Sequence, residues 1–469
     1  HTNYLLPKPY RGMVAYLPFV IEAYTETNDA GKIHRFIASK ILTPYQTKYF
    51  TQGVEVLYWN GIPIQQAIAL NGEHQAGGNP DARLARGLEA LTIRPLARSL
   101  PPDEEWVVLT YKDNNGDVRT LKQEWLVFDP DLSGGIDAES GVLPATALGL
   151  DVQADIINKS KKSFYASPGV NKVASQAQSA PKIVQAIFNG TEITTGLPNF
   201  KAFAGQHNGL GFGYIRIYTF NVADDVAFVD LFLDIVKQLP ETGLIIDVRN
   251  NGGGLIWAAE RLLQALVARP IEPQPAQFIN TSLTLEICRR NNPSQVVSSL
   301  DLNRWIPSIE QSIQTGAAYS LGYPITPLSR LQGIQAGYPG KVVLITDALC
   351  YSATDMFAAG FKDHGIGKIL GTSGNTGAGG ANVWTHTLLD RLLRQPGPPY
   401  TPYPTSPFKP LPFGAEMRVA IRRTLRVGAQ AGVPVEDLGI TPDEIHDLTR
   451  DDLLYDNVDL IKHACMMLV

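Results

Sequence analysis

The sequence predicts an α/β protein in which a β-rich module precedes a core of alternating strands and helices. Two observations carry this prediction. Between residues 53 and 128, apolar positions follow strand periods around Asn/Gly turns, and from residue 211 onward short apolar runs alternate with helical repeats. The 469 residues are 44% hydrophobic and 18% charged, which suffices for a sizeable core.

The β-rich module begins with the apolar run 54–59, which leads into an Asn-Gly turn. A second run, 106–111, is followed by an Asn-Asn-Gly-Asp turn and the run 118–121. Two such runs around a turn predict a β-hairpin. Residues 81–91 are expected to form a helix between the first strand and the hairpin.

In the core, short continuous apolar runs at 244–248, 341–346 and 368–370 predict buried parallel strands. Helices are expected after the first two of these runs, at 255–268 and 353–363. The remaining expected elements are strands at 214–220 and 416–425 and helices at 226–236 and 453–466.

We expect four parts along the chain: an N-terminal segment 1–45, the β-rich domain 46–130, a linker 131–210 and the core 211–469. The linker contains the stretch 159–182, which is polar, rich in Ser and Lys, and without apolar periodicity. Such a composition predicts an exposed loop. Because the chain opens with His rather than Met, we interpret it as a fragment or a processed product.

Charge and cysteine content exclude several classes of protein. The net charge of −5 comes without a basic stripe, no apolar run approaches the roughly 20 residues of a membrane span, and the three cysteines form no CxxC pair. We therefore expect no nucleic-acid partner, no membrane span, no metal and no other cofactor. The compartment stays unknown: the protein is expected to be soluble, with secretion left open, and a homodimer is also left open.

One candidate site lies where the strand 244–248 ends. The strand runs into Asn250-Asn251 and three glycines, Gly252-Gly253-Gly254, before the next helix. Glycines allow positive φ and close backbone approach, and amides at a helix start can hold an anion. A tight strand–helix turn is the alternative, but it needs only one or two glycines. Ligands prefer this end of α/β sheets, which favours a functional role.

A second candidate is Ser352, which stands between the strand 341–346 and the helix 353–363. A hydroxyl at such a junction is exposed, and the adjacent amide of Ala353 is unpaired within its helix. This arrangement suits a nucleophile beside an oxyanion donor. The alternative is a serine that only caps the helix, since serine is a favoured N-cap.

Together these segments resemble the C-terminal-processing and tricorn-type serine peptidases. The resemblance rests on 244–254, on the box from Ser352 to Gly360, on Asp363-His364-Gly365 and on Gly371, and its spacing matches across about 211–443. It implies a crotonase-like (ClpP/crotonase) αββ-type core with an inserted PDZ-like domain at 53–128. It also implies that Ser352 is the nucleophile.

This sequence departs from the processing peptidases at the position of their general base. Those enzymes use a lysine shortly after the glycine that matches Gly371, and here that position is Gly377. The sequence has no lysine between Lys368 and Lys409, so a Ser–Lys dyad is not expected.

The tricorn-like and chlamydial protease-like branches use Ser, His and Glu instead. Their Glu-x-x-Gly-x-x-Pro-Asp run matches Glu436 to Asp443, and the end of their Asp-x-His-Thr motif matches His1-Thr2. The alternatives are a disordered terminal residue for His1 and a solvated loop acid for Glu436. The same resemblance implies an internal inhibitory segment, removed by self-cleavage, near 159–182.

Other residues that could compete for these roles are interpreted as structural. His364 occupies a family position without a catalytic duty, and Cys350 is expected to be a small buried residue. The histidines without a surrounding motif are His207, His386, His446 and His463.

We therefore predict a serine endopeptidase that works through an acyl-enzyme and binds its polypeptide substrate extended, as an added strand. Ser352 attacks the peptide carbonyl, His1 carries the proton, and Glu436 orients His1. The predicted oxyanion hole is formed by backbone amides, those of Ala353 and of Gly252 or Gly253. Two rivals are a non-catalytic binding protein on the same fold and a crotonase-like acyl-CoA enzyme, for which the sequence has no adenine-binding signature.

Overall fold

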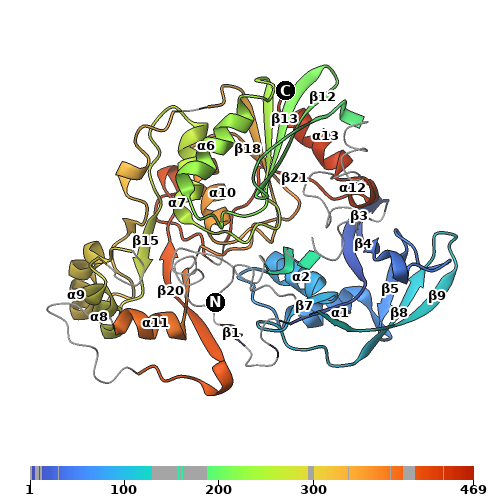
Figure 1. Cartoon of the computed structure of the whole chain (residues 1–469), viewed down its shortest axis with the longest axis horizontal. Coiled ribbons are helices and arrows are strands. Elements are labelled where there is room, and N and C mark those ends of the chain that lie inside the picture. Colours follow the sequence, from blue (N-terminus) through green and yellow to red (C-terminus); the bar gives the residue numbers. More distant parts are fainter. Residues whose placement is uncertain are drawn as a thin grey trace.

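The structure is a computed structural model. It describes residues 3–5, 10, 13–29, 31–128, 156–158, 160–161, 187–293, 300–335, 337–380, 382–394, 407–436 and 438–469. His1 and nearly all of 159–182 lie outside these residues, so the predictions that concern them stay predictions. Figure 1 shows a β-rich domain on one side of the α/β core, and a smaller helical lobe on the other.

The β-rich domain is built on one six-stranded sheet, ordered β3-β4-β5-β8-β9 with β6 beside β5. Its elements are β3 (Phe19–Asn28), β4 (Gly31–Ile41), β5 (Glu55–Trp59), β6 (Ile62–Pro63), α1 (Ile64–Gly72), α2 (Pro80–Ala90), β8 (Trp106–Lys112) and β9 (Val118–Glu124). The expected hairpin is confirmed as β8 and β9, and the expected helix as α2. The sheet starts at residue 19, well before the expected boundary at 46, because the β3–β4 hairpin pairs with β5.

The core sheet has seven strands in the order β11-β12-β13-β14-β17-β18-β21, and it is parallel from β13 onward. Its strands are β11 (Thr191–Ile193), β12 (Phe200–His207), β13 (Leu210–Ile217), β14 (Gly243–Asp247), β17 (Lys341–Thr346), β18 (Lys368–Gly371) and β21 (Glu444–Ile445). The three predicted buried strands are confirmed as β14, β17 and β18. Strand β12 belongs to this sheet, although its residues were expected in the linker.

Helices cover both faces of the core sheet. One face packs on α6 (Asp225–Val236), α7 (Ile256–Leu266) and α10 (Ala353–Asp363), and the other on α13 (Val458–Met467). Side chains of β14 alternate between the two faces, as a strand requires: Leu244 and Ile246 join the first cluster, and Ile245 joins the second. The last expected helix is divided into α12 (Arg450–Leu454) and α13, because Asp456 and Asn457 have φ of 55° and 64°.

A smaller sheet lies beside the core and carries the helical lobe. It joins β1 (Asn3–Leu5), β20 (Glu416–Thr424), β15 (Pro275–Phe278) and β16 (Tyr323–Pro324), with β19 (Asn382–Thr385) also on β20. Helices α8 (Ser282–Arg290), α9 (Ile306–Thr315) and α11 (His386–Leu393) pack on it. Strand β1 therefore joins the core side of the molecule, whereas β3 and β4 belong to the β-rich domain (Figure 1). A further three-stranded sheet is formed by β10 (Leu126–Phe128), β2 (Val14–Tyr16) and β7 (Ile93–Pro95).

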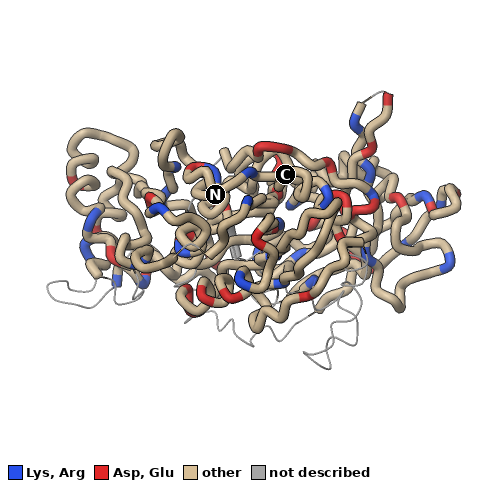
Figure 2. The backbone as a smooth tube through the Cα atoms, turned by 90° about the horizontal axis from the view of Figure 1, so that it is seen from above, with Lys and Arg blue, Asp and Glu red and all other residues tan. Residues whose placement is uncertain are grey.

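Acidic and basic residues are interspersed along the described chain, as Figure 2 shows. Among the described residues, no helix is long and apolar enough to cross a membrane. No group of His, Cys, Asp and Glu side chains within the same residues has the arrangement of a metal site.

Candidate active site

Ser352 stands on a strained turn between β17 and α10. Its φ of 58° and ψ of −120° are outside the usual range for a residue with a side chain, and they cost on the order of 1–3 kcal/mol. Its hydroxyl makes no capping hydrogen bond to the helix, so the interpretation of Ser352 as a helix cap is not supported. Such strain persists only where the surrounding structure enforces it, so the residues around this turn must hold Ser352 in this conformation.

The glycine turn after β14 lies directly against Ser352. A Cβ on Gly253 would be 2.8 Å from the Cβ of Ser352 and 2.9 Å from the amide nitrogen of Ala353. Gly253 has a φ of 98° and Gly254 a φ of 141°, which only glycine adopts readily. The two turns that the sequence singles out are therefore in contact.

Asn251 holds these two turns together. It is fully buried, and its backbone carbonyl oxygen accepts a hydrogen bond from the backbone amide of Tyr351 at 3.1 Å. Its side chain accepts from the amide of Gly253 at 2.9 Å and donates to the carbonyl of Ile217 at 3.1 Å. One asparagine thus fixes the glycine turn, the end of β13 and the residue before Ser352.

The carboxyl end of β14 is anchored by a buried ion cluster. Asp247 pairs with Arg216 and with Arg249, whose Nη2 is 2.8 Å from a carboxylate oxygen. Burial alone would raise the pKa of Asp247, but the two guanidinium groups outweigh it and hold this pKa well below its usual value. The carboxylate therefore stays ionised and keeps the start of the glycine turn in place.

The loop after β18 packs on the other side of Ser352. The amide of Gly377 donates to the carbonyl of Cys350 at 2.8 Å, and the amide of Gly379 donates to the carboxylate of Asp355 at 2.6 Å. A Cβ on Gly379 would be 2.8 Å from the amide nitrogen of Ser352. Burial raises the pKa of Asp355 to about 7, although hydrogen bonds from Thr376 and Gly379 oppose this shift. Asp355 thus ties the first turn of α10 to the loop.

The backbone of Glu436 lies against the loop after β18, the loop that packs on Ser352. A Cβ on Gly380 would lie 3.1 Å from the backbone nitrogen of Glu436, and Gly380 follows the glycine that touches Ser352. Further along, the hydroxyl of Thr376 accepts a hydrogen bond from the amide of Ile440 at 2.7 Å. The segment from Glu436 onward therefore lines the loop that packs on the serine turn.

His1 lies outside the described residues, but the strand that follows it is placed. Strand β1 pairs antiparallel with β20, with Asn3 opposite Arg418 and Leu5 opposite Glu416. Beyond the end of β20, the amide of Val435 donates to the carbonyl of Thr424 at 2.9 Å. The chain next to His1 thus lies on the strand whose far end contacts the residue before Glu436.

Gly377 is the residue expected from the sequence to match the lysine of the processing peptidases. A Cβ there would be 2.5 Å from the ring of Tyr351 and 2.7 Å from the carbonyl oxygen of Cys350. The space is filled, so a lysine could not enter without displacing the residues that precede Ser352.

We therefore expect Gly377→Lys to destabilise the fold by about 1–3 kcal/mol through overpacking, without creating a Ser–Lys enzyme. Thermal unfolding measures the first effect. The second is measured as peptide turnover in a Glu436→Gln background. Gly211→Lys is the control, because a Cβ on Gly211 would have its nearest contact at 3.4 Å and its φ is not positive. Turnover restored by Gly377→Lys would contradict this expectation.

The competing residues have other contacts. Cys350 is buried, and its thiol contacts the carbonyl of Val248 at 3.2 Å; burial raises its pKa well above the usual value, so the thiol is protonated and unreactive. His364 is 3.2 Å from the carbonyl oxygen of Glu272, and burial lowers its pKa. His446 lies between His463, at 3.2 Å, and Asp452, at 2.7 Å; His207 and His386 lie beside Phe188 and Phe408.

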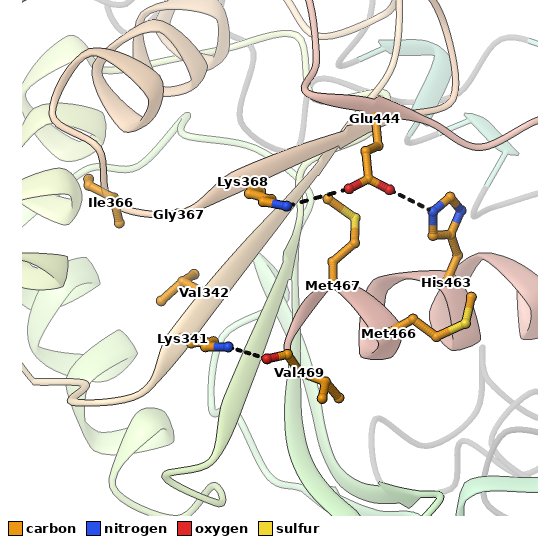
Figure 3. Close-up of a pocket in the computed structure, with 10 residues that line it drawn as sticks. All are labelled: Lys341, Val342, Ile366, Gly367, Lys368, Glu444, His463, Met466, Met467 and Val469. Atoms are coloured by element: carbon orange, nitrogen blue, oxygen red, sulfur yellow. Dashed lines mark hydrogen bonds and ion pairs between the residues drawn. The ribbon is translucent and has the colours of Figure 1, made fainter.

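Two of the cavities among the described residues flank the core, and neither of these two has Ser352 in its lining. A cavity of about 500 Å³ lies at the C-terminal helix, where Glu444 interacts with both Lys368 and His463 (Figure 3). A larger one, about 910 Å³, lies between β3 and α2 of the β-rich domain and the core. The larger cavity reaches Asp347 and Leu349, just before the serine turn.

Comparisons with known proteins identify the class to which this chain belongs, that of serine-type peptidases with a PDZ domain. The model of peptidase family S41 matches residues 211–444, and a PDZ-domain model matches residues 13–132. The chain belongs to peptidase family S41.

Individual relatives agree with this family. The C-terminal processing peptidase, chloroplastic, of Tetradesmus obliquus is 42% identical over 57 residues, which is 12% of this chain and only 12% of that protein. Among solved structures, mature CPAF is similar over 99% of this chain and 83% of its own, with a TM-score of 0.62 and 17% identity. Mature CPAF complexed with lactacystin gives a TM-score of 0.61 at 18% identity, over 99% of this chain and 84% of its own. At such identities the likeness is one of fold.

Proposed function

We propose that this chain is a serine endopeptidase on a crotonase-like core, with Ser352, His1 and Glu436 as its catalytic residues. The observation that carries this proposal is the strained turn of Ser352 at the carboxyl edge of the sheet. This turn packs between the glycine turn after β14 and the loop after β18. A nucleophile must be presented clear of its own helix, and the Ser352 hydroxyl makes no capping bond to α10. Contrary to the expectation of an exposed hydroxyl, Ser352 is only 9% exposed.

In the proposed reaction, the neutral imidazole of His1 takes the proton of the Ser352 hydroxyl while the oxygen attacks the peptide carbonyl carbon. The tetrahedral intermediate collapses to an acyl-enzyme, and the leaving amine receives the proton from His1. Water, deprotonated by the same imidazole, then attacks the acyl carbon. The acid product leaves, and the imidazole returns its proton to the Ser352 oxygen. Glu436 orients the ring and stabilises its protonated form.

For the oxyanion hole, we propose the amides of Ala353 and Gly252. Gly253 was the other option, but its amide already donates to the side chain of Asn251. Ala353 is the first residue of α10, where backbone amides have no partner within the helix. Two such donors aimed at one oxygen stabilise the charge that develops there. The proposed substrate is an extended polypeptide, held by backbone hydrogen bonds.

Labelling with a fluorophosphonate followed by peptide mapping tests this proposal. We expect the label on Ser352 and on no other serine, because only an activated hydroxyl attacks phosphorus. Ser373 is the internal control, since it lies nearby and its hydroxyl is 3.3 Å from the amide of Ala348. A label spread over several serines, or absent, would contradict the proposal. Tight peptide binding without labelling would favour the non-catalytic binding protein instead.

A further inference from the structure

Helix α2 of the PDZ domain reaches across to the residue that precedes the nucleophile. Its Arg86 is 5% exposed, and its Nε donates to the hydroxyl of Tyr351 at 3.0 Å. The guanidinium carbon also lies 4.1 Å from the centre of the Tyr351 ring. A stacked and hydrogen-bonded arginine fixes an aromatic ring in both position and tilt.

Asn79, at the start of the same helix, makes a second contact with the site. Its side-chain oxygen accepts from the amide of Ala82 at 2.8 Å and so caps α2. Its side-chain nitrogen donates to the carbonyl of Thr376 at 2.8 Å. One buried asparagine therefore couples the first turn of a PDZ helix to the loop that packs on the serine turn.

Both contacts act on groups that touch Ser352. The ring of Tyr351 fills the space beside Gly379, where a Cβ would be 2.6 Å from it. The backbone of Tyr351 accepts a hydrogen bond from the amide of Thr354 at 3.0 Å, in the first turn of α10. Gly377, the residue after Thr376, holds the carbonyl of Cys350. Side chains from the PDZ domain thus contact both segments that pack against the strained turn of Ser352.

We propose that Arg86 and Asn79 are positioning residues of the active site, through which the PDZ helix holds the Ser352 turn in its reactive conformation. The inference rests on the proposed function for its kinetic consequence, but its structural part concerns only the turn and the loop. Neither residue touches the substrate bond. Their effect passes through Tyr351 and Thr376.

The test compares Arg86→Met with a matched control at another contact between the same two domains. Arg450 of the core donates from Nη2 to the carbonyl of Gly53 in the PDZ domain at 2.7 Å, so Arg450→Met also removes an interdomain arginine bond. Arg86→Met is expected to slow fluorophosphonate labelling of Ser352 by about tenfold or more, since small displacements of a reacting group have such costs. Arg450→Met is expected to leave the labelling rate within about twofold of the wild type.

Two further variants guard against a simple folding defect. Tyr351→Phe keeps the ring and removes only the hydroxyl that Arg86 binds, so its labelling rate should lie between those of the wild type and Arg86→Met. The double variant Arg86→Met, Tyr351→Phe should label no more slowly than Arg86→Met, because both changes break the same contact. Equal slowing by Arg86→Met and Arg450→Met, or additive slowing in the double variant, would overturn the inference.

Hydrogen exchange provides a readout that does not need activity. The amides of Gly377 and Gly379 are hydrogen bonded around the serine turn, and they should exchange faster in Arg86→Met but not in Arg450→Met. Unchanged exchange at these amides in Arg86→Met would overturn the inference. A wild-type chain that fails to label would overturn the proposed function alone, because the exchange comparison still decides the positioning role.

Discussion

Ser352→Ala is expected to abolish peptide hydrolysis and leave the fold intact. The hydroxyl is the proposed nucleophile, and losing a nucleophile of this kind lowers turnover by about 10⁶-fold. Stability should change little, because the hydroxyl makes no capping bond to α10 and alanine meets the same backbone strain at φ 58°. Peptide turnover and thermal unfolding of the purified variant measure the two effects.

Ser373→Ala is the matched control for this experiment, because it removes a neighbouring hydroxyl that is bonded to the amide of Ala348. It should retain turnover. If Ser352→Ala hydrolyses peptides at the wild-type rate, the nucleophile is a different residue.

The second large effect is expected for Glu436→Gln. The amide keeps the size of the side chain but loses the charge that stabilises a protonated imidazole, and such a loss lowers turnover by up to about 10⁴-fold. The effect should fall on kcat, with KM nearly unchanged, because Glu436 is not expected to hold the substrate. Steady-state kinetics on a peptide substrate measure both constants.

Glu444→Gln is the control for this second variant. Glu444 lies on β21 just beyond the same segment, and it contacts Lys368 and His463 rather than the serine turn. A similar loss of turnover in both variants would mean that the segment, and not the carboxylate of Glu436, matters. An unchanged kcat in Glu436→Gln would make this residue a bystander.

The elements that the sequence predicts best are those buried on both faces. Strand β17 and helix α10 have the expected bounds, because a continuous apolar run and a serine junction mark their ends. The hairpin of β3 and β4 was not predicted. Only four of the ten residues of β3 are buried, and its apolar positions are mixed with Glu and Thr, so it has little of the pattern that marks a buried strand.

The residues of the candidate site also divide into those that the sequence predicts and those that it does not. Ser352 and the three glycines follow strand ends, and such local signals are readable from the chain. The side chains that contact the turns of that site from distant segments could not be predicted, because the residues next to them in the sequence do not indicate their partners. These side chains are Asn251, Asp355, Asn79 and Arg86. Asn79 offers only a helix-capping signal, and the structure shows that its second hydrogen bond reaches the loop behind Ser352.

The pairing of β1 with β20 affects the order in which this molecule can be assembled. Asn3 lies far before its partner Arg418 along the chain, so β1 must wait unpaired while the intervening chain is synthesised. Closing so large a loop has a high entropic cost, and contacts of this kind form late in folding. The proposed base precedes β1, and the proposed acid follows β20. A nascent chain in which β20 has not yet been made would therefore lack the complete site that we propose.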